Sequence, residues 1–268
     1  MGIVGSCAFR WIVPVSLACA AVVPGAASAQ SLYVIPTEGS APVVESQQPL
    51  RVLLHARDPE RLAGILGVQG SAAGTDTLSY VLDRYPAIQG LTERTWLDAT
   101  FVLDYRDEKV MQLTAAFMKG LGRKPAANEA TRAALVGFVA GTVKGSQDQG
   151  FDIASEVATR RQGDCTEYAV LTAALARSIG IPARVVLGLA VVAEPKQYGA
   201  YGHAWAEVRI GDTWVVADAA LAGLELPLWY LPFGVLENEG MGYTMDVARL
   251  TPVWVQRVEV LGPLEKGR

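Results

Sequence analysis

The sequence is poor in the side chains that bind metals and form disulfides. Its 268 residues include three cysteines and two histidines, His55 and His203. So few Cys and His side chains nearly exclude a zinc site of the usual kind, which needs four ligands. The sequence also contains no acidic cluster with the spacing of a calcium-binding loop. It therefore gives no reason to expect a metal or another cofactor.

Charged residues are scarce as well, and the basic ones are not clustered. There are 23 Lys and Arg residues against 27 Asp and Glu residues, which gives a formal net charge of −4. Nucleic-acid-binding proteins usually carry a basic patch, so nucleic acid is not an expected partner. Hydrophobic residues make up 51% of the chain, enough for a packed core. The length fits one good-sized domain, or a main domain with a smaller one.

Residues 1–29 predict a secretory signal peptide. Arg10 is their one charged residue, the apolar stretch Trp11–Val23 follows it, and Ala27-Ser28-Ala29 fits a signal-peptidase site. This stretch is too short for a comfortable membrane span; an uncleaved anchor and lipoprotein cleavage before Cys19 are the alternatives. No later segment is apolar and long enough to span a membrane. We therefore expect an exported protein, periplasmic or secreted, without stable membrane insertion.

Cleavage of this leader would leave Cys165 as the one cysteine, because Cys7 and Cys19 leave with the leader. The mature chain could then form no internal disulfide, although its compartment is oxidising. Two interpretations of Cys165 follow: it is buried and inert, or it is a nucleophile. A histidine partner for the thiol would have to be His55 or His203.

The hydrophobic pattern predicts a mainly β N-terminal region at residues 30–100, followed by helices and then a sheet in residues 101–268. The predicted strands lie at 43–44, 50–54, 96–103, 183–192, 204–210, 213–217 and 253–261. The predicted helices lie at 59–66, 106–121, 128–143, 155–160 and 165–179, and residues 67–74, 145–150 and 224–233 are predicted to be irregular. This order indicates an α+β fold in which a helix packs on an antiparallel sheet.

Cys165 is predicted to lie in the first turn of a helix. Asp164 is a good N-cap, and Glu167 at the third helical position completes a capping box. Free N–H groups and the helix dipole at this end favour a thiolate, and they can also donate to an oxyanion. Gly163, just before the cap, would let a substrate backbone come close. A buried structural cysteine that begins a helix is the alternative.

Two further residues complete a possible catalytic set. His203 lies 38 residues after Cys165 at the start of a predicted strand, and Asp218 ends the strand that follows. A hairpin turn at Gly211-Asp212 would bring Asp218 beside His203, where it could orient the imidazole. Each residue alone has an ordinary explanation, His203 as a surface or core residue and Asp218 as a turn residue. Together the three fit one mechanism.

These residues resemble the bacterial transglutaminase-like superfamily. The resemblance rests on Gly163–Glu167, Leu175–Gly188, His203-Ala204-Trp205 with Glu207-Val208, and Trp214-Val215 with Asp218, and covers about residues 100–222. It implies a papain-like α+β core, makes 101–268 the catalytic domain, and implies acyl transfer through a cysteine thioester. Carried over, Cys165 is the nucleophile, His203 the base and then the acid, and Asp218 the group that orients His203.

Some positions are less well defined by the resemblance. Asp218 is followed by Ala219-Ala220, where the family often has Pro after the Asp, so the loop near the site is expected to differ. Trp205 is interpreted as a packing residue, His55 as unrelated to catalysis, and the apolar run 226–233 as a cover of the core or a wall of the cleft. No second oxyanion donor is evident, because Gln162 is only a neighbour in sequence.

The predicted function is cysteine-dependent acyl transfer on amide bonds of a protein or peptide substrate. Water as acceptor gives an amidase or peptidase, and lysine gives a cross-linking transglutaminase. We favour hydrolysis, since nothing marks a dedicated amine site. The alternatives are a non-catalytic domain that binds a peptide or partner, and a helper that processes one dedicated partner of a secreted system. The sequence does not define the oligomeric state.

Overall fold

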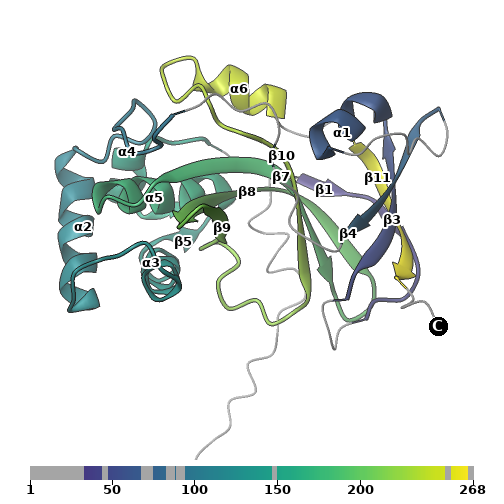
Figure 1. Ribbon diagram of the computed structural model, residues 1–268, viewed down its shortest axis with the longest axis horizontal. Coiled ribbons are helices and arrows are strands. Elements are labelled where there is room, and N and C mark those ends of the chain that lie inside the picture. Colours follow the sequence, from purple (N-terminus) through teal and green to yellow (C-terminus); the bar gives the residue numbers. More distant parts are fainter. Residues whose placement is uncertain are drawn as a thin grey trace, which may run out of the picture.

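A long antiparallel hairpin, β7 (Ala183–Ala193) and β8 (Tyr198–Ile210), runs through the middle of the molecule (Figure 1). The computed structural model describes residues 33–43, 48–67, 75–82, 88, 94–146, 150–250 and 255–264. The first sheet has the order β1-β8-β7-β10, in which β1 is Tyr33–Ile35 and β10 is Leu228–Val235. Strand β9 (Thr213–Ala217) also pairs with β8, and every pairing in this sheet is antiparallel.

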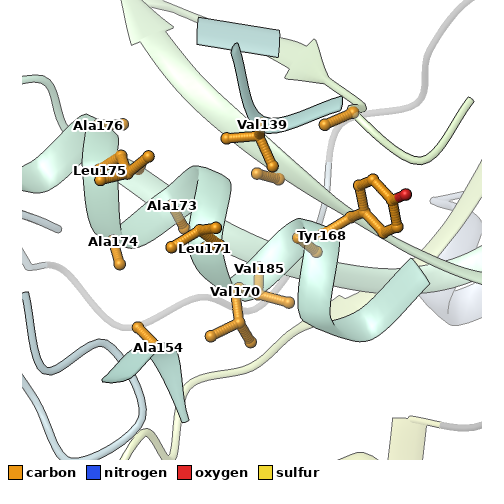
Figure 2. Packing of buried hydrophobic residues seen from close by; sticks show 14 of the residues in the cluster. Val139, Ala154, Tyr168, Val170, Leu171, Ala173, Ala174, Leu175, Ala176 and Val185 are labelled. Carbon is orange, nitrogen blue, oxygen red and sulfur yellow. The ribbon is translucent and has the colours of Figure 1, made fainter. Parts of the chain in front are cut away.

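Four helices gather at one end of this hairpin: α2 (Glu108–Leu121), α3 (Glu129–Thr142), α4 (Ala154–Arg160) and α5 (Cys165–Ser178) (Figure 1). Every residue of α5 from Cys165 to Arg177 is buried. Figure 2 shows this alanine-rich helix among residues of its neighbours, Val139 of α3, Ala154 of α4 and Val185 of β7. Short alanine side chains let α5 sit close to the sheet, so the helix is held on all sides by packing.

The far end of α5 is fixed by a buried ion pair. The Arg177 guanidinium donates to both carboxylate oxygens of Glu239, at 2.7 and 2.8 Å. Glu239 lies after β10, and its carboxylate also accepts from Arg94 at 2.9 Å. A bidentate pair of this kind has strict geometry, so it fixes the direction of the helix as well as its position.

A second, smaller sheet covers the other end of the hairpin. Its order is β2-β11-β3-β4, formed by Thr37–Gly39, Val255–Pro263, Leu50–Ala56 and Thr77–Leu82, and α1 (Pro59–Leu66) packs on it. Leu189 and Val191 of β7 belong to the same apolar cluster as this sheet. The remaining elements are the parallel pair β5 (Lys144–Gly145) and β6 (Gln162–Gly163), and α6 (Tyr243–Leu250). The second sheet therefore packs against the hairpin that forms the centre of the first sheet.

The predicted α+β class, with the cysteine helix on an antiparallel sheet, is confirmed. Three element predictions are wrong. Val43, predicted to begin a strand, lies outside any strand. Residues 96–103 form bends and irregular backbone instead of a strand, and Trp96 among them has a left-handed backbone with φ of 57°, which no strand residue adopts. Residues 228–233, predicted to be irregular, lie in β10. Strand β10 is at the edge of its sheet and its register shifts between Pro232 and Gly234, and an edge strand with a bulge tolerates proline.

Several predictions fall on residues outside the described part of the chain: the leader at 1–29, Val44 of the strand at 43–44, and most of the loops at 67–74 and 145–150. The boundary near residue 100 stays a prediction, but strand pairing crosses it, since β1 joins β8 and β11 lies between β2 and β3. Among the residues that the structure describes, no helix has both the length and the apolar character needed to cross a membrane.

Candidate active site

The N-terminus of α5 carries the predicted capping box. The Asp164 side chain accepts from the Thr166 N–H at 2.8 Å, and the Glu167 side chain accepts from the Asp164 N–H at 2.8 Å. Both carboxylates are nearly inaccessible to water. This double cap fixes the first turn of the helix, and with it the position of Cys165.

Glu167 has a second role as a buried acceptor. Its Oε1 atom accepts from the Asp152 N–H and the Thr166 hydroxyl, each at 3.0 Å. Burial is the main cause that raises its pKa, and the bond from Asp152 opposes it; repulsion by Asp164 also contributes, and the pKa is raised to about 7. A Cβ at Gly163 would lie 2.3 Å from Glu167 Cβ, so the glycine makes room for this side chain, where we expected it to admit a substrate.

Along one edge of β8, the described strand pairs do not include the residues of the candidate site. Strand β1 pairs with β8 up to Gly202, and β9 pairs with it from Ala206 onward. His203, Ala204 and Trp205 therefore have no strand partner on this side among the described residues. The N–H of Ala204 donates to the thiol of Cys165. The start of α5 thus contacts β8 at Ala204, the residue that follows His203.

His203 and Asp218 contact each other on the face of the sheet opposite to α5. The side chain of Ala204 packs with α5, while Trp205 belongs to a cluster on the opposite face, where the His203 and Trp205 rings stack 6.0 Å apart. His203 Nε2 lies 2.7 Å from Asp218 Oδ2, and both side chains are buried. An ionised carboxylate can only accept, so we assign the proton to Nε2, which leaves Nδ1 as a proton acceptor.

Asp218 is surrounded by donors. Its Oδ2 also accepts from the Tyr230 hydroxyl at 2.8 Å, and its Oδ1 accepts from the N–H groups of Ala220 and Leu221 at 2.9 and 3.2 Å. Burial alone would raise the pKa of Asp218, but the charge and hydrogen bond of His203, helped by Tyr230 and Leu221, lower it. The carboxylate is therefore ionised, and the turn at Ala219-Ala220 is what binds it.

The pKa of the Cys165 thiol, in contrast to that of Asp218, is raised. Cys165 is fully buried, and burial, followed by repulsion from Asp164, raises its pKa well above the ordinary value, although the Ala204 N–H acts in the other direction. The expectation that the helix N-terminus alone favours a thiolate is therefore not met. Ionisation of this thiol at neutral pH would therefore require a base.

Other residues considered from the sequence lie away from this arrangement. His55 is on β3 in the second sheet, where its ring nitrogens contact Glu259 at 3.3 Å and Arg257 at 3.0 to 3.1 Å. Gln162 is exposed in β6. In the part of the chain that the structure describes, no group of three His, Cys, Asp or Glu side chains is placed to hold a metal ion.

The residue that sequence reasoning missed is Tyr230. Its strand was predicted to be irregular because Pro227 and Pro232 interrupt the apolar run. The run 228–233 shows no alternation of polar and apolar residues, and it is the pairing of β10 with β7 that places Tyr230 on the face that carries His203.

Residues 116–219 match the family model of the transglutaminase-like superfamily. This segment contains Cys165, His203 and Asp218, and it lies within the range over which the sequence resembles that family. This segment of the chain is therefore similar to the transglutaminase-like superfamily, which supports a cysteine-based enzyme family.

Two solved structures are similar to the chain at lower levels. One is a candidate cysteine protease from Cytophaga hutchinsonii, with 20% identity and a TM-score of 0.42, and the other is a TGase with 20% identity and a TM-score of 0.32. The matches cover 69% and 42% of this chain, which spans only 59% and 33% of those proteins. A comparison with curated proteins gave no match.

Proposed function

We propose that this protein is an exported enzyme that cleaves amide bonds through a thioester at Cys165. The observation that carries the proposal is the buried His203–Asp218 hydrogen bond of 2.7 Å, next to a thiol at a capped helix N-terminus. A buried ionised carboxylate that holds a histidine in one tautomer is the arrangement that a general base requires.

The proposed reaction has two halves. His203 Nδ1 takes the thiol proton as Cys165 Sγ forms a bond to the amide carbonyl carbon. The C–N bond then breaks, and the amine leaves with the proton from His203. N–H groups at the start of α5 would stabilise the oxyanion. Water, deprotonated by His203, attacks the thioester and releases the acid and the thiol.

The protonated resting thiol is compatible with this order of reaction steps. Because burial raises its pKa, a preformed thiolate is not needed to explain activity, and proton transfer to His203 accompanies attack. Asp218 stabilises the imidazolium that forms, since it is ionised and bonded to Nε2. The proposal therefore assigns the roles of nucleophile, base and orienting group to Cys165, His203 and Asp218.

The test is the rate at which iodoacetamide alkylates Cys165, followed from pH 5 to 10 by mass spectrometry of the peptide that contains it. At pH 7 we expect His203→Ala to react about 100-fold more slowly than the wild type, at the lower end of general-base contributions. His55→Ala is the matched control, since it removes the other histidine of the chain. Equal rates in the wild type and His203→Ala would exclude the proposed base.

One observation favours a second function, that of a non-catalytic peptide-binding module. The thiol is completely buried, as expected for a structural cysteine. A slow thiol that ignores His203 in the alkylation test would support this second function.

Product analysis separates hydrolysis from cross-linking. Casein is incubated with the protein and a fluorescent primary amine. We propose hydrolysis as the main reaction, so new termini or ammonia should appear in excess of bound amine, and both should vanish in Cys165→Ser. Export is tested separately by the N-terminus of the protein from the native cell, which we expect at Gln30.

A further inference from the structure

Tyr230 connects the edge strand β10 to the His203–Asp218 pair. Its hydroxyl donates to Asp218 Oδ2 at 2.8 Å, the same oxygen that accepts from His203 Nε2 at 2.7 Å. Its ring stacks at 6.3 Å on the His203 ring and lies 5.0 Å from the Trp205 ring. The tyrosine therefore contacts both members of the pair.

We infer that Tyr230 is a positioning residue, which keeps Asp218 charged and in line with His203; this inference rests on the function proposed above. A carboxylate removed from water needs donors to remain ionised. Two backbone N–H groups hold Oδ1, so the Tyr230 hydroxyl and His203 are the donors to Oδ2. Without the hydroxyl, Oδ2 would depend on His203 alone, the group that it must orient.

The backbone fixes Tyr230 in this place. Gly188 of β7 pairs with His203 on one side and with Pro232 of β10 on the other. A Cβ at Gly188 would lie 2.0 Å from the Leu231 carbonyl oxygen, so β10 is pressed against β7 beside the site. The register then places Tyr230 opposite Ala190, on the face that carries His203. A close approach of this kind leaves little freedom for the strand that presents the hydroxyl.

The charges around Asp218 come from several elements. Among the described residues, His203 faces it from β8, Tyr230 from β10 and the Cys165 thiol from α5. Arg132 of α3 donates to the Val216 carbonyl at 3.0 Å, and its charge acts on Tyr230. A positive charge that acts on Tyr230 favours donation by its hydroxyl toward Asp218.

The test uses the imidazole N–H signal of His203 in protein labelled with 15N-histidine. With only two histidines, His203→Ala assigns the signal directly. In the wild type the Nε2–H signal should persist to low pH, because it lasts while Asp218 is ionised. In Tyr230→Phe we expect the signal to be lost about one pH unit higher, since a hydrogen bond to a charged group is worth roughly that shift. Phenylalanine keeps the ring stacking, so the variant should fold.

Tyr105→Phe is the matched control, because it also removes one hydroxyl that donates in a half-buried place, to the Leu97 carbonyl at 3.1 Å. Its loss is expected to leave the His203 signal where it is in the wild type. If Tyr230→Phe also loses the His203 signal at the wild-type pH, Tyr230 is only a packing residue and the inference is wrong.

A double-mutant cycle with Asp218→Asn tests whether Tyr230 acts on the thiol through Asp218. We expect Tyr230→Phe to slow alkylation of Cys165 at pH 7 about ten-fold in the wild-type background, and to change nothing once Asp218 is Asn. An equal slowing in both backgrounds would mean that Tyr230 acts elsewhere, and would contradict the inference. If alkylation proves independent of His203, the proposed function fails, while the shift of the imidazole signal still decides whether Tyr230 holds the pair.

Discussion

At the scale of single residues, the hydroxyl of Tyr33 is as unusual as that of Tyr230. Tyr33 begins β1, and its ring covers Gly202, where a Cβ would lie 2.5 Å from Tyr33 Cε1. Its hydroxyl is buried without a hydrogen-bond partner among the described residues, and burial raises its pKa. The two hydroxyls thus differ, since that of Tyr230 donates to Asp218 and that of Tyr33 has no partner in the part of the chain that the structure describes.

Tyr33→Phe should therefore stabilise the protein. Removing a buried hydroxyl that lacks a partner avoids a desolvation penalty, so the free energy of unfolding should rise by about 1 kcal/mol. Tyr198→Phe on the neighbouring strand is the matched control, because the Tyr198 hydroxyl accepts from the Val43 N–H at 3.2 Å and its loss should destabilise. Urea unfolding measures both. A decrease in stability for Tyr33→Phe would show that its hydroxyl does have a partner.

At the scale of elements, the start of α5 makes stability depend on pH. Glu167 has a pKa raised to about 7 in the folded protein, against 4.5 for the ordinary side chain. The folded state therefore holds this proton more tightly than the unfolded chain does. Its contribution to stability is complete below pH 4.5 and is lost as the pH rises through 7.

Glu167→Gln should remove this dependence. Between pH 4.5 and 7 the unfolding free energy of the wild type should fall relative to that of the variant, by on the order of 3 kcal/mol. Urea titrations of both proteins at several pH values give the difference directly, and other titrating groups cancel in it. Parallel curves for the two proteins would mean that Glu167 stays ionised throughout this range.

The elements that could be predicted are those with local signals. The start of α5 followed from the capping box at Asp164 and Glu167, and the β8–β9 hairpin followed from Gly211-Asp212, where the glycine has φ of 59°. These signals also brought His203 and Asp218 together. The family resemblance added the chemistry that is usual for such an arrangement.

What could not be predicted depends on distant contacts. Strand β10 looked irregular because edge position, not sequence, makes its prolines tolerable, so the hydrogen bond from Tyr230 was missed. The raised pKa of Cys165 follows from complete burial, which no local pattern reports. The left-handed backbone of Trp96 has no local sequence signal either, since tryptophan rarely adopts it.

At the scale of the whole molecule, the neighbouring strands β1 and β2 link the two sheets. β1 and β2 are separated by Pro36 alone, yet they pair with β8 in the first sheet and with β11 in the second. Thr37 adds a hydrogen bond from its hydroxyl to the Tyr198 carbonyl at 2.6 Å. Tyr33 at the start of β1 pairs with Gly202, next to His203, so the segment that links the two sheets runs beside the candidate site.

The C-terminal strand β11 should therefore affect the stability of strands that are distant from it in the sequence. β11 lies between β2 and β3 and contributes Val255, Val258 and Val260 to a core shared with β7. Each buried valine is worth about 1.5 kcal/mol or more, so their joint loss approaches the whole stability of a typical domain. Ending the chain before Val255 should abolish hydrogen-exchange protection in β3 and β4, and should lower it in the part of β7 around Val191.

Ending the chain after Leu264 is the control, because it keeps β11 whole and should leave protection at the wild-type level. If β3 and β4 stay protected in the shorter protein, the second sheet forms without its central strand, and the two ends of the chain are independent.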